Sequence, residues 1–340
     1  MLFKKILNIF KKMENSNDNI YSNLWNEYFN QIFIENNTIP IYISKNSNVH
    51  GPNIICFHGA GHSALSFSLL SSLSKNYRII SYDYRNHGYN KMEPKNDLSI
   101  ETLINDSEKV LLKINELFPK DTMIILGHSL GGGVAVKTCK HILKTEFNKD
   151  LYDKIQGLIV VDVVEGSAKE AIPFMMKVVN NKQKEFNNIE EAIKYMNNTQ
   201  IKNLQSCNVS IPPLLFFNKN NNKYEWKTDL EKTEKFWDDW YKNLSNEFLS
   251  IKVPKNLILN DTSELDTPLT IGHMQGKFKL TVIKGTGHFI HEDAPEVFLE
   301  YLDEFIKTFR IPNTIDEINL IQSKLGNQTK IVKYAEFTGA

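Results

Sequence analysis

The 340-residue chain has few cysteines and no apolar run long enough to cross a membrane. Its three cysteines, Cys56, Cys139 and Cys207, are scattered and form no Cys-x-x-Cys pair. They therefore predict neither a disulfide framework nor structural zinc, and they suggest a reducing compartment. No stretch approaches the roughly 20 apolar residues of a membrane span. We therefore expect a cytoplasmic protein, also present in the nucleus, with no transmembrane segment.

The chain also lacks an excess of charge of either sign. Its 40 basic residues balance 40 acidic ones, so there is no electrostatic reason to expect nucleic acid or an anionic membrane as a partner. Residues 1–12 are basic and amphipathic, but lysines interrupt their apolar positions, which makes them a poor secretory signal. The 41% of hydrophobic residues is enough for a substantial core. The length allows one large domain with an insertion, or two domains.

The most informative stretch lies at residues 123–133. Four apolar residues run directly into Gly127-His128-Ser129-Leu130-Gly131, and a helical pattern follows. A strand, a sharp turn and a helix are the context in which Gly-x-Ser-x-Gly is typical of a nucleophile elbow. We predict that Ser129 is the nucleophile and that the N–H of Leu130 is one oxyanion donor.

A glycine-rich loop follows an earlier buried strand at residues 53–57. The loop, residues 58–63, begins His58-Gly59-Ala60-Gly61. This position along the chain is where the architecture places its second oxyanion donor, and small residues let the backbone approach a substrate carbonyl closely. We predict the N–H of Ala60 as that donor. An Asp83–Arg85 ion pair is expected to brace the next loop.

An acid and a base follow in the chain order typical of α/β-hydrolases. Asp162 interrupts the predicted strand 157–166 toward its carboxyl end, whereas Asp266 follows the strand 256–259 and is the rival acid. His288 lies in a Gly-His turn after the last predicted strand, so it is the candidate general base. We expect an α/β-hydrolase fold with a mostly parallel central sheet, helices on both faces and an inserted helical lid.

The predicted division of the chain is a tail, a core interrupted by the lid, and a second tail. Residues 1–30 form the N-terminal tail, 31–166 and 251–310 the core, 167–250 the lid, and 311–340 the C-terminal tail. Helical patterns over 171–179, 189–196 and 230–249 define the lid, and most of its aromatic residues are expected to pack in the core. The segments flanking Pro40 predict an antiparallel edge pair, because proline suits an edge strand.

A metal site is not expected, although the chain has nine histidines. Those considered as ligands lie on separate predicted loops with no His-Glu-x-x-His pattern, and they are His58, His62, His87, His128, His273 and His291. We predict no metal and no cofactor.

The sequence resembles the protein phosphatase methylesterases over roughly residues 50–310. Beyond the elbow and the oxyanion loop, the matching stretches lie in the acid loop, the lid and the segment before the final strand. They cover residues 162–166, 230–237, 244–246, 269–278 and 287–295. Generic α/β-hydrolases do not need the lid and Met-Gln-Gly-Lys-Phe segments. The resemblance favours Asp162 over Asp266 as the triad acid.

The resemblance implies the substrate and the partner. They would be the methyl ester on the C-terminal leucine of the type 2A protein phosphatase catalytic subunit, cleaved to methanol and a free carboxylate through an acyl-enzyme on Ser129. Candidate substrate contacts are Gly59, Gly61, His128, Met274, Gln275 and Phe278. A monomer is expected. Two alternatives stay open: an esterase or lipase for small lipophilic esters, and a protein that binds the phosphatase without needing turnover.

Overall fold

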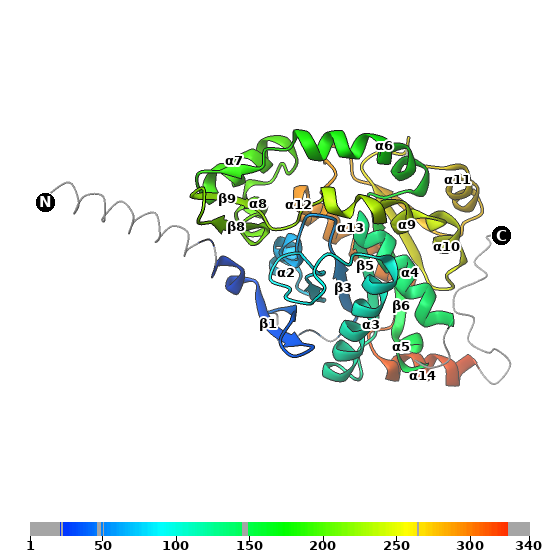
Figure 1. Cartoon of the computed structure of the whole chain (residues 1–340). Helices are drawn as coiled ribbons and strands as arrows, with labels where there is room; N and C mark the ends of the chain where they lie inside the picture. The colour runs from blue at the N-terminus through cyan, green and yellow to red at the C-terminus, as the bar shows by residue number, and fades with distance from the viewer. Residues whose placement is uncertain are drawn as a thin grey trace, which may run out of the picture.

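A single mixed sheet of eight strands forms the centre of the molecule. The computed structural model describes residues 21, 23–45, 49, 51–144, 149–263 and 265–325, so the basic N-terminal segment lies outside the described residues. The strand order is β1-β2-β4-β3-β5-β6-β10-β11 (Figure 1). The strands are β1 (Phe29–Ile34), β2 (Ile39–Ser44), β3 (Asn53–Phe57), β4 (Arg78–Tyr82), β5 (Met123–His128), β6 (Ile155–Val161), β10 (Lys255–Leu259) and β11 (Lys279–Val282).

The sheet is parallel from β4 to β11, and β1 and β2 join it antiparallel. This confirms the predicted antiparallel pair, but β2 is not an edge strand, because β1 and β4 flank it. Pro40 is tolerated because pairing with β4 begins only at Ile41 and Pro40 contributes its carbonyl, which accepts from the N–H of Asp83. The mostly parallel sheet of the prediction is confirmed.

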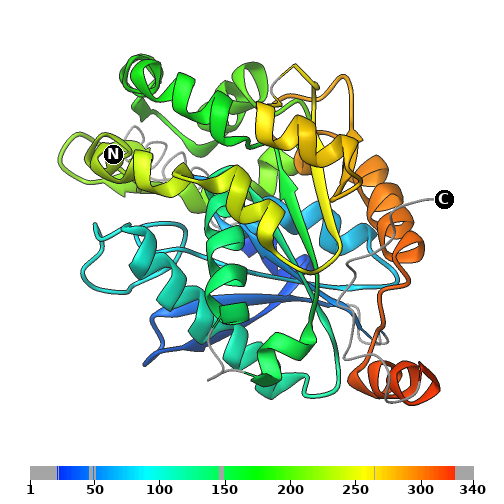
Figure 2. The same ribbon diagram turned by 90° about the vertical axis from the view of Figure 1, so that its right-hand side faces the viewer.

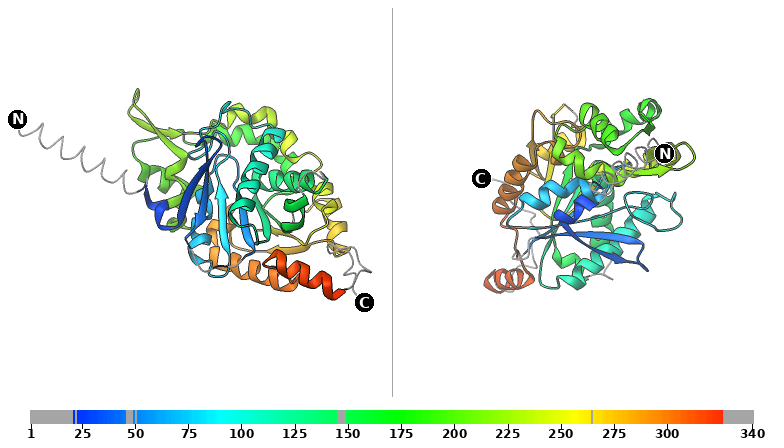
Figure 3. Two further views of the ribbon diagram at one scale, coloured as in Figure 1. Left: turned by 90° about the horizontal axis from the view of Figure 1, so that it is seen from below. Right: turned by 90° about the vertical axis from the view of Figure 1, so that its left-hand side faces the viewer.

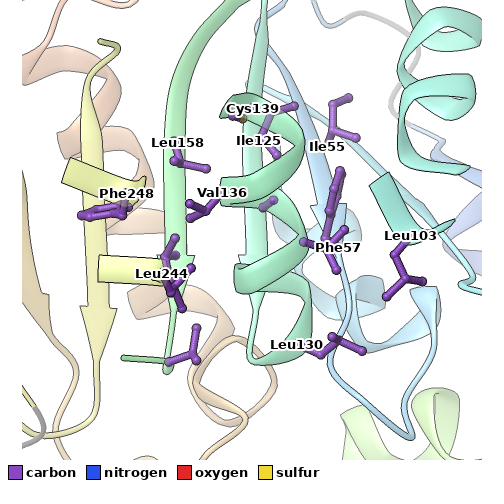
Figure 4. Close-up of a cluster of buried hydrophobic side chains, with 14 of the residues drawn as sticks. Ile55, Phe57, Leu103, Ile125, Leu130, Val136, Cys139, Leu158, Leu244 and Phe248 are labelled. Atoms are coloured by element: carbon purple, nitrogen blue, oxygen red, sulfur yellow. The ribbon is translucent and has the colours of Figure 1, made fainter. Parts of the chain in front are cut away.

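Helices cover both faces of the sheet because its central strands are apolar on both sides. In β5, Ile125 faces one core with α3 and α4, whereas Ile124 and Leu126 face the other with α2 and α13. Figure 4 shows the first core, where Ile125 and Leu158 of the sheet lie under Val136 of α4. The helices of the body are η1 (Leu24–Glu27), η2 (Ala64–Phe67), α2 (Ser68–Leu73), α3 (Ile100–Leu117), α4 (Leu130–Lys144), α5 (Lys149–Lys154), α11 (Thr267–Met274), α12 (Ile290–Asp293), α13 (Pro295–Thr308) and α14 (Ile315–Leu325).

The lid, residues 167–250 of the predicted division, lies across the end of the body opposite α14 (Figures 1, 2 and 3). The sequence predicted a helical lid, but the lid also contains a three-stranded antiparallel sheet in the order β7-β9-β8. The predicted helix over 230–249 is broken, because Asn243 adopts a left-handed conformation with φ of 59°. Its elements are α6 (Glu165–Asn181), β7 (Glu185–Phe186), α7 (Ile189–Thr199), α8 (Leu204–Ser210), η4 (Pro212–Leu214), β8 (Leu215–Asn218), β9 (Lys223–Trp226), η5 (Glu231–Phe236), α9 (Trp237–Tyr241) and α10 (Leu244–Ser250).

The predicted Asp83–Arg85 pair is wrong. Arg85 donates instead to Asp106 of α3, at 2.5 Å from Nε and 3.0 Å from Nη2, in a buried fork. Asp83 accepts the backbone N–H groups of Ala64 and Tyr89 at 2.8 and 2.9 Å. The loop is therefore braced by two separate carboxylates. Within the described residues, no helix combines the length and the apolar character needed to span a membrane.

Candidate active site

Ser129 occupies the sharp turn between β5 and α4. Its φ of 54° lies in the left-handed region, which is uncommon for a residue other than glycine. Its N–H donates to the carbonyl of Val161 at 3.0 Å, which ties the turn to β6. A Cβ on Gly127 would clash with the carbonyl of Gly131, and one on Gly131 would clash with the carbonyl of Phe57. The turn therefore closes only with small residues at both flanks.

Asp162 and His288 meet at the carboxyl ends of β6 and β11. Nδ1 of His288 lies 2.7 Å from Oδ2 of Asp162, so the ring N–H donates to the carboxylate. Asp162 is buried and also has a left-handed φ of 52°. The His288 side chain remains 48% exposed, so substrate and water can reach it. With the proton on Nδ1, the lone pair of a neutral His288 ring lies on Nε2, the arrangement that a general base requires.

Asp266, the rival acid, lies elsewhere and has other partners. Its Oδ1 accepts the N–H of Leu269 at 3.0 Å, which caps the first turn of α11. Its Oδ2 accepts the hydroxyl of Ser245 at 2.5 Å and the N–H of Gly166 at 3.3 Å. Asp266 therefore joins α11 to the lid, and the structure brings Asp162 to His288 instead.

His128 connects the elbow to the loop that carries His288. Its Nε2 lies 2.8 Å from the carbonyl of His288, and the two rings are 4.7 Å apart. Because a carbonyl only accepts, Nε2 must carry the proton. Burial holds the pKa of His128 well below its usual range, so the ring stays neutral and keeps this donor. The Gly287 N–H donates to Asp293 at 2.6 Å and fixes the same loop from its other side.

Two neutral histidines brace the loop of residues 58–61. The N–H of Tyr84 donates to Nε2 of His58 at 3.0 Å, and the N–H of Gly61 donates to Nε2 of His87 at 2.9 Å. Each Nδ1 must then be protonated, and it donates to the carbonyl of Gly59 or Arg85. Burial lowers the pKa of His87 to about 4 and holds that of His58 well below its usual range, which preserves both acceptors.

This braced loop touches the elbow. A Cβ on Gly59 would come within 2.9 Å of His128 Nδ1 and 3.3 Å of Ser129 Cβ, so the loop backbone lies directly beside Ser129. Within the described residues, the N–H groups of Ala60 and Leu130 have no protein acceptor. Leu130 begins α4, where the first N–H groups of a helix are unpaired and favour negative charge.

The six candidate substrate contacts fall into two groups. Gly59, Gly61 and His128 lie around Ser129 and its loop. Met274, 82% exposed, and Gln275 lie at the end of α11. Phe278 is buried, with its ring centre 5.3 Å from that of Phe248. Only the first group is adjacent to Ser129, and the substrate-contacting role of all six stays a prediction.

Tyr241 of α9 lies beside the site, although the sequence analysis treated it only as one of the lid aromatics expected to pack in the core. Its hydroxyl is buried and interacts with the side chain of Ser129, and burial raises the pKa of Tyr241 to about 12. Among the described residues, no hydrogen bond joins the Ser129 hydroxyl to His288, so the two side chains must come together for proton transfer. The tyrosine itself was the available signal, because a phenylalanine would pack equally well.

The histidines considered as metal ligands have other partners. His58, His87 and His128 hold backbone groups, and His291 stacks on Phe67. In the part of the chain that the structure describes, no three or more His, Cys, Asp or Glu side chains are grouped to hold a metal ion. The chemistry that the site offers from its own residues is an activated hydroxyl beside a histidine–carboxylate pair.

Comparison with known proteins gives a family and several named relatives. Residues 54–301 match the model of the alpha/beta hydrolase family. The chain is 39% identical over 249 residues to protein phosphatase methylesterase 1 of Schizosaccharomyces pombe, covering 71% of this chain and 70% of that protein. It is 32% identical over 343 residues to protein phosphatase methylesterase 1 of Homo sapiens, covering 86% of each.

Solved structures share the fold at lower identity. The E-2-(acetamidomethylene)succinate hydrolase superimposes with a TM-score of 0.65 at 17% identity, over 82% of this chain and all of that one. A marine microorganism esterase gives a TM-score of 0.58 at 20% identity, over 82% of this chain and 99% of that one. At such identities the likeness supports the fold alone.

Proposed function

The chain belongs to the protein phosphatase methylesterases of the alpha/beta hydrolase family and is a carboxylic ester hydrolase, and from that premise we propose its substrate and mechanism. The substrate is the methyl ester on the C-terminal leucine of a type 2A protein phosphatase catalytic subunit. Ser129, Asp162 and His288 form the catalytic triad, and the N–H groups of Ala60 and Leu130 form the oxyanion hole.

The proposed reaction passes through an acyl-enzyme. Ser129 Oγ attacks the ester carbonyl while His288 Nε2 takes its proton, and Asp162 stabilises the imidazolium that forms. The bond to the methoxy oxygen then breaks, and His288 returns the proton so that methanol leaves. Water attacks the acyl group on Ser129 with His288 again as base, which releases the carboxylate and restores the hydroxyl.

The oxyanion hole supplies a large share of the rate. Negative charge develops on the carbonyl oxygen only as the tetrahedral intermediate forms, and two fixed N–H groups stabilise it there without reorganising. The neutral His58 and His87 keep the Ala60 segment in place, and the start of α4 adds its dipole. Loss of one such donor typically costs about 3 kcal/mol of barrier.

One observation carries the mechanistic part of the proposal. It is the 2.7 Å contact between His288 and Asp162 at the same edge of the sheet as a left-handed Ser129. The substrate part rests on the relatives, whose names specify a protein phosphatase methyl ester. A monomeric state and a cytoplasmic and nuclear location stay predictions.

Methanol release from a methylated phosphatase tests the whole proposal. Ser129→Ala should lower kcat by about 10⁴-fold or more, because the nucleophile is removed and only binding and the oxyanion donors remain. A small activated ester measured in parallel separates the phosphatase ester from generic lipophilic esters. Full turnover by Ser129→Ala would sink the mechanism, and turnover of the small ester alone would sink the substrate assignment.

A further inference from the structure

A cavity of about 490 Å³ lies between the lid and the loop that carries the proposed oxyanion donor. We call it the lid cavity. Its lining includes Gly61 on one side and Trp226, Leu230, Lys182 and Lys227 from the lid. A Cβ on Gly61 would already touch Leu230 at 3.0 Å, so loop and lid are in close contact at this rim. Because Gly61 directly follows Ala60, the lid cavity begins one residue beyond the proposed oxyanion hole.

Lys182 brings a cation into the lid cavity without a carboxylate partner. It follows the last turn of α6, and its ammonium lies 3.7 Å from the centre of the Trp226 ring. Among the described residues, no Asp or Glu lies within ion-pair distance of it. Burial lowers the pKa of Lys182 to about 8, which means that its charge is poorly hydrated. Its charge also lowers the pKa of the buried His62, next to Gly61.

Lys227 is the second such cation. Its ammonium donates to the carbonyl of Gly88 at 2.9 Å and lies 4.3 Å from the centre of the Tyr89 ring. Two of its three N–H donors remain for a ligand. Within the described part of the chain it forms no ion pair, and burial lowers its pKa to about 8, although the buried carboxylate of Asp83 lies close enough to act against this shift.

The other charged groups around the lid cavity have partners of their own. Lys184 pairs with Glu231 at 2.6 Å, and Lys232 pairs with Asp229 at 2.8 Å. Glu225 accepts amide N–H groups from Asn218 and Asn221 at 2.8 and 2.7 Å, and Glu185 accepts from Asn221 at 3.3 Å. Among the lining lysines of the described chain, Lys182 and Lys227 are therefore the two that form no ion pair, and Lys182 is the one that no described carboxylate compensates.

We propose that the lid cavity binds an anionic side chain, a carboxylate or a phosphate, that lies a few residues before the esterified C-terminus of the polypeptide substrate. The inference rests on the proposed function and on a substrate chain that has its last carbonyl at Ser129 and leaves across the loop of residues 59–61. An extended chain advances about 3.3 Å per residue, so its upstream side chains reach a cavity that starts at this loop. An incoming anion gains most from cations that are partly desolvated and unpaired.

Short peptide esters test this inference. The probes are hexapeptide leucine methyl esters with aspartate or asparagine at each upstream position in turn, and phosphoserine against serine at the preferred position. We expect kcat/KM to be about 10-fold or more higher for the anionic member at one position. In Lys182→Met and Lys227→Met the ratio between the paired peptides should fall toward one, because methionine keeps the apolar stem and removes the charge. Lys182→Arg should restore it. The aspartate and phosphoserine peptides distinguish a carboxylate from a phosphate ligand. The anion with the larger kcat/KM ratio over its neutral counterpart is the preferred group.

Lys177→Met is the matched control. Lys177 is exposed on α6 and outside the cavity lining, so its loss changes the net charge equally and should leave the ratio intact. The ratio is measured within each variant, so partial misfolding cancels. Equal cleavage of anionic and neutral peptides, or a ratio that survives in both methionine variants, would overturn the inference alone. Cleavage of no peptide ester, with a small ester still hydrolysed, would overturn the proposed function and this inference together.

Discussion

The helix after Ser129 and the first helix of the lid have similar lengths and opposite surroundings. In α4, ten of 15 residues are buried, whereas α6 has no buried residue among 17. Phe174 and Val178 of α6 are 68% and 65% exposed. Ion pairing differs in the same way: Arg85–Asp106 of the body is buried, and Lys184–Glu231 of the lid is exposed.

This difference separates two requirements of an esterase. The reacting groups must be held to a fraction of an ångström, and the body achieves this with buried backbone hydrogen bonds and obligatory glycines. A surface that receives a polypeptide needs groups that are not already satisfied, and the lid supplies exposed apolar side chains and unpaired lysines. Substitutions in the body should therefore affect the reaction or the fold, and substitutions in the lid the choice of substrate.

The largest effect on catalysis is expected when the carboxylate of Asp162 in the body is removed. Asp162→Asn should lower kcat by about 10⁴-fold, because asparagine keeps the size but no longer holds His288 in the required tautomer or stabilises its charged form. Asparagine tolerates left-handed backbone, so the fold should persist. Asp266→Asn is the matched control, and its kcat should change less than about 10-fold. Steady-state hydrolysis of one ester by both variants checks this. A larger loss of kcat in Asp266→Asn than in Asp162→Asn would make Asp266 the triad acid.

A methyl group in the elbow should be the next most damaging change. Gly131→Ala places a Cβ against the carbonyls of Phe57 and His58 at the end of β3, which cannot move without breaking the sheet. We expect a loss of about 3 kcal/mol in the free energy of unfolding. Gly276 has a φ of 67°, but a Cβ there would meet no atom within 4 Å. Gly276→Ala should therefore lower the free energy of unfolding by only about 1 kcal/mol. Urea unfolding of the two variants gives the difference, and equal losses would contradict a tightly packed elbow.

Glu292 tests the comparison where the lid meets the body, because it contacts both regions. Its Oε2 accepts the hydroxyl of Ser206 in the lid at 2.6 Å, and its Oε1 lies 3.3 Å from Nε2 of His62 in the body. Burial raises the pKa of Glu292 from 4.5 to about 8, while the pKa of His62 is lowered, so a neutral acid faces a neutral imidazole.

The sign of the pH dependence follows from this raised pKa. Between about pH 4.5 and 8 the folded state holds a proton on Glu292 that the unfolded state has lost, so the contribution of Glu292 to stability should fall as pH rises, by up to about 1.4 kcal/mol per unit. The buried neutral histidines, whose pKa values are lowered, contribute in the opposite sense below about pH 6.5, so the effect of Glu292 is measured as a difference between variants. In urea unfolding from pH 5 to 8, the free energy of unfolding of the wild type minus that of Glu292→Gln should fall as pH rises, whereas Glu296→Gln, at an exposed position on α13, should keep the wild-type pH dependence. A difference that does not change with pH would contradict a protonated Glu292.

The smallest effect on stability is expected on the lid surface. Phe174→Ser with Val178→Ser should change the free energy of unfolding by less than about 0.5 kcal/mol, because both side chains are already in water. Val136→Ala, on the buried face of α4, should cost about 2 kcal/mol. Turnover of a small ester by the lid variant should stay within about twofold, and turnover of a methylated phosphatase should drop. A stability loss equal to that of Val136→Ala would mean that α6 is packed like the body.

The sequence predicts the body well because its signals are local. The apolar runs of β3, β5 and β6 and the glycines beside Ser129 report burial and close approach directly. The family resemblance added Asp162, which spacing alone had left open against Asp266. The ion pair of Arg85 was missed because its partner, Asp106, is 21 residues away and only the packing of α3 brings it near.

The lid is harder to predict for physical reasons. β7, β8 and β9 have two to four residues each, too short for an alternating pattern to be visible. The break at Asn243 depends on a left-handed residue within an otherwise helical pattern. The approach of Tyr241 to Ser129 depends on how α9 packs on α4, which no local signal carries.

The left-handed backbone at Ser129 also limits how this enzyme can evolve. A β-branched residue is strongly disfavoured at a φ of 54°, so threonine cannot replace the serine although it carries the same hydroxyl. Cysteine has no branch at Cβ, and it is the nucleophilic exchange that this turn accommodates with the least strain. Lineages descended from this chain can therefore move between an oxygen and a sulfur nucleophile, while the route to a threonine enzyme is closed by the backbone.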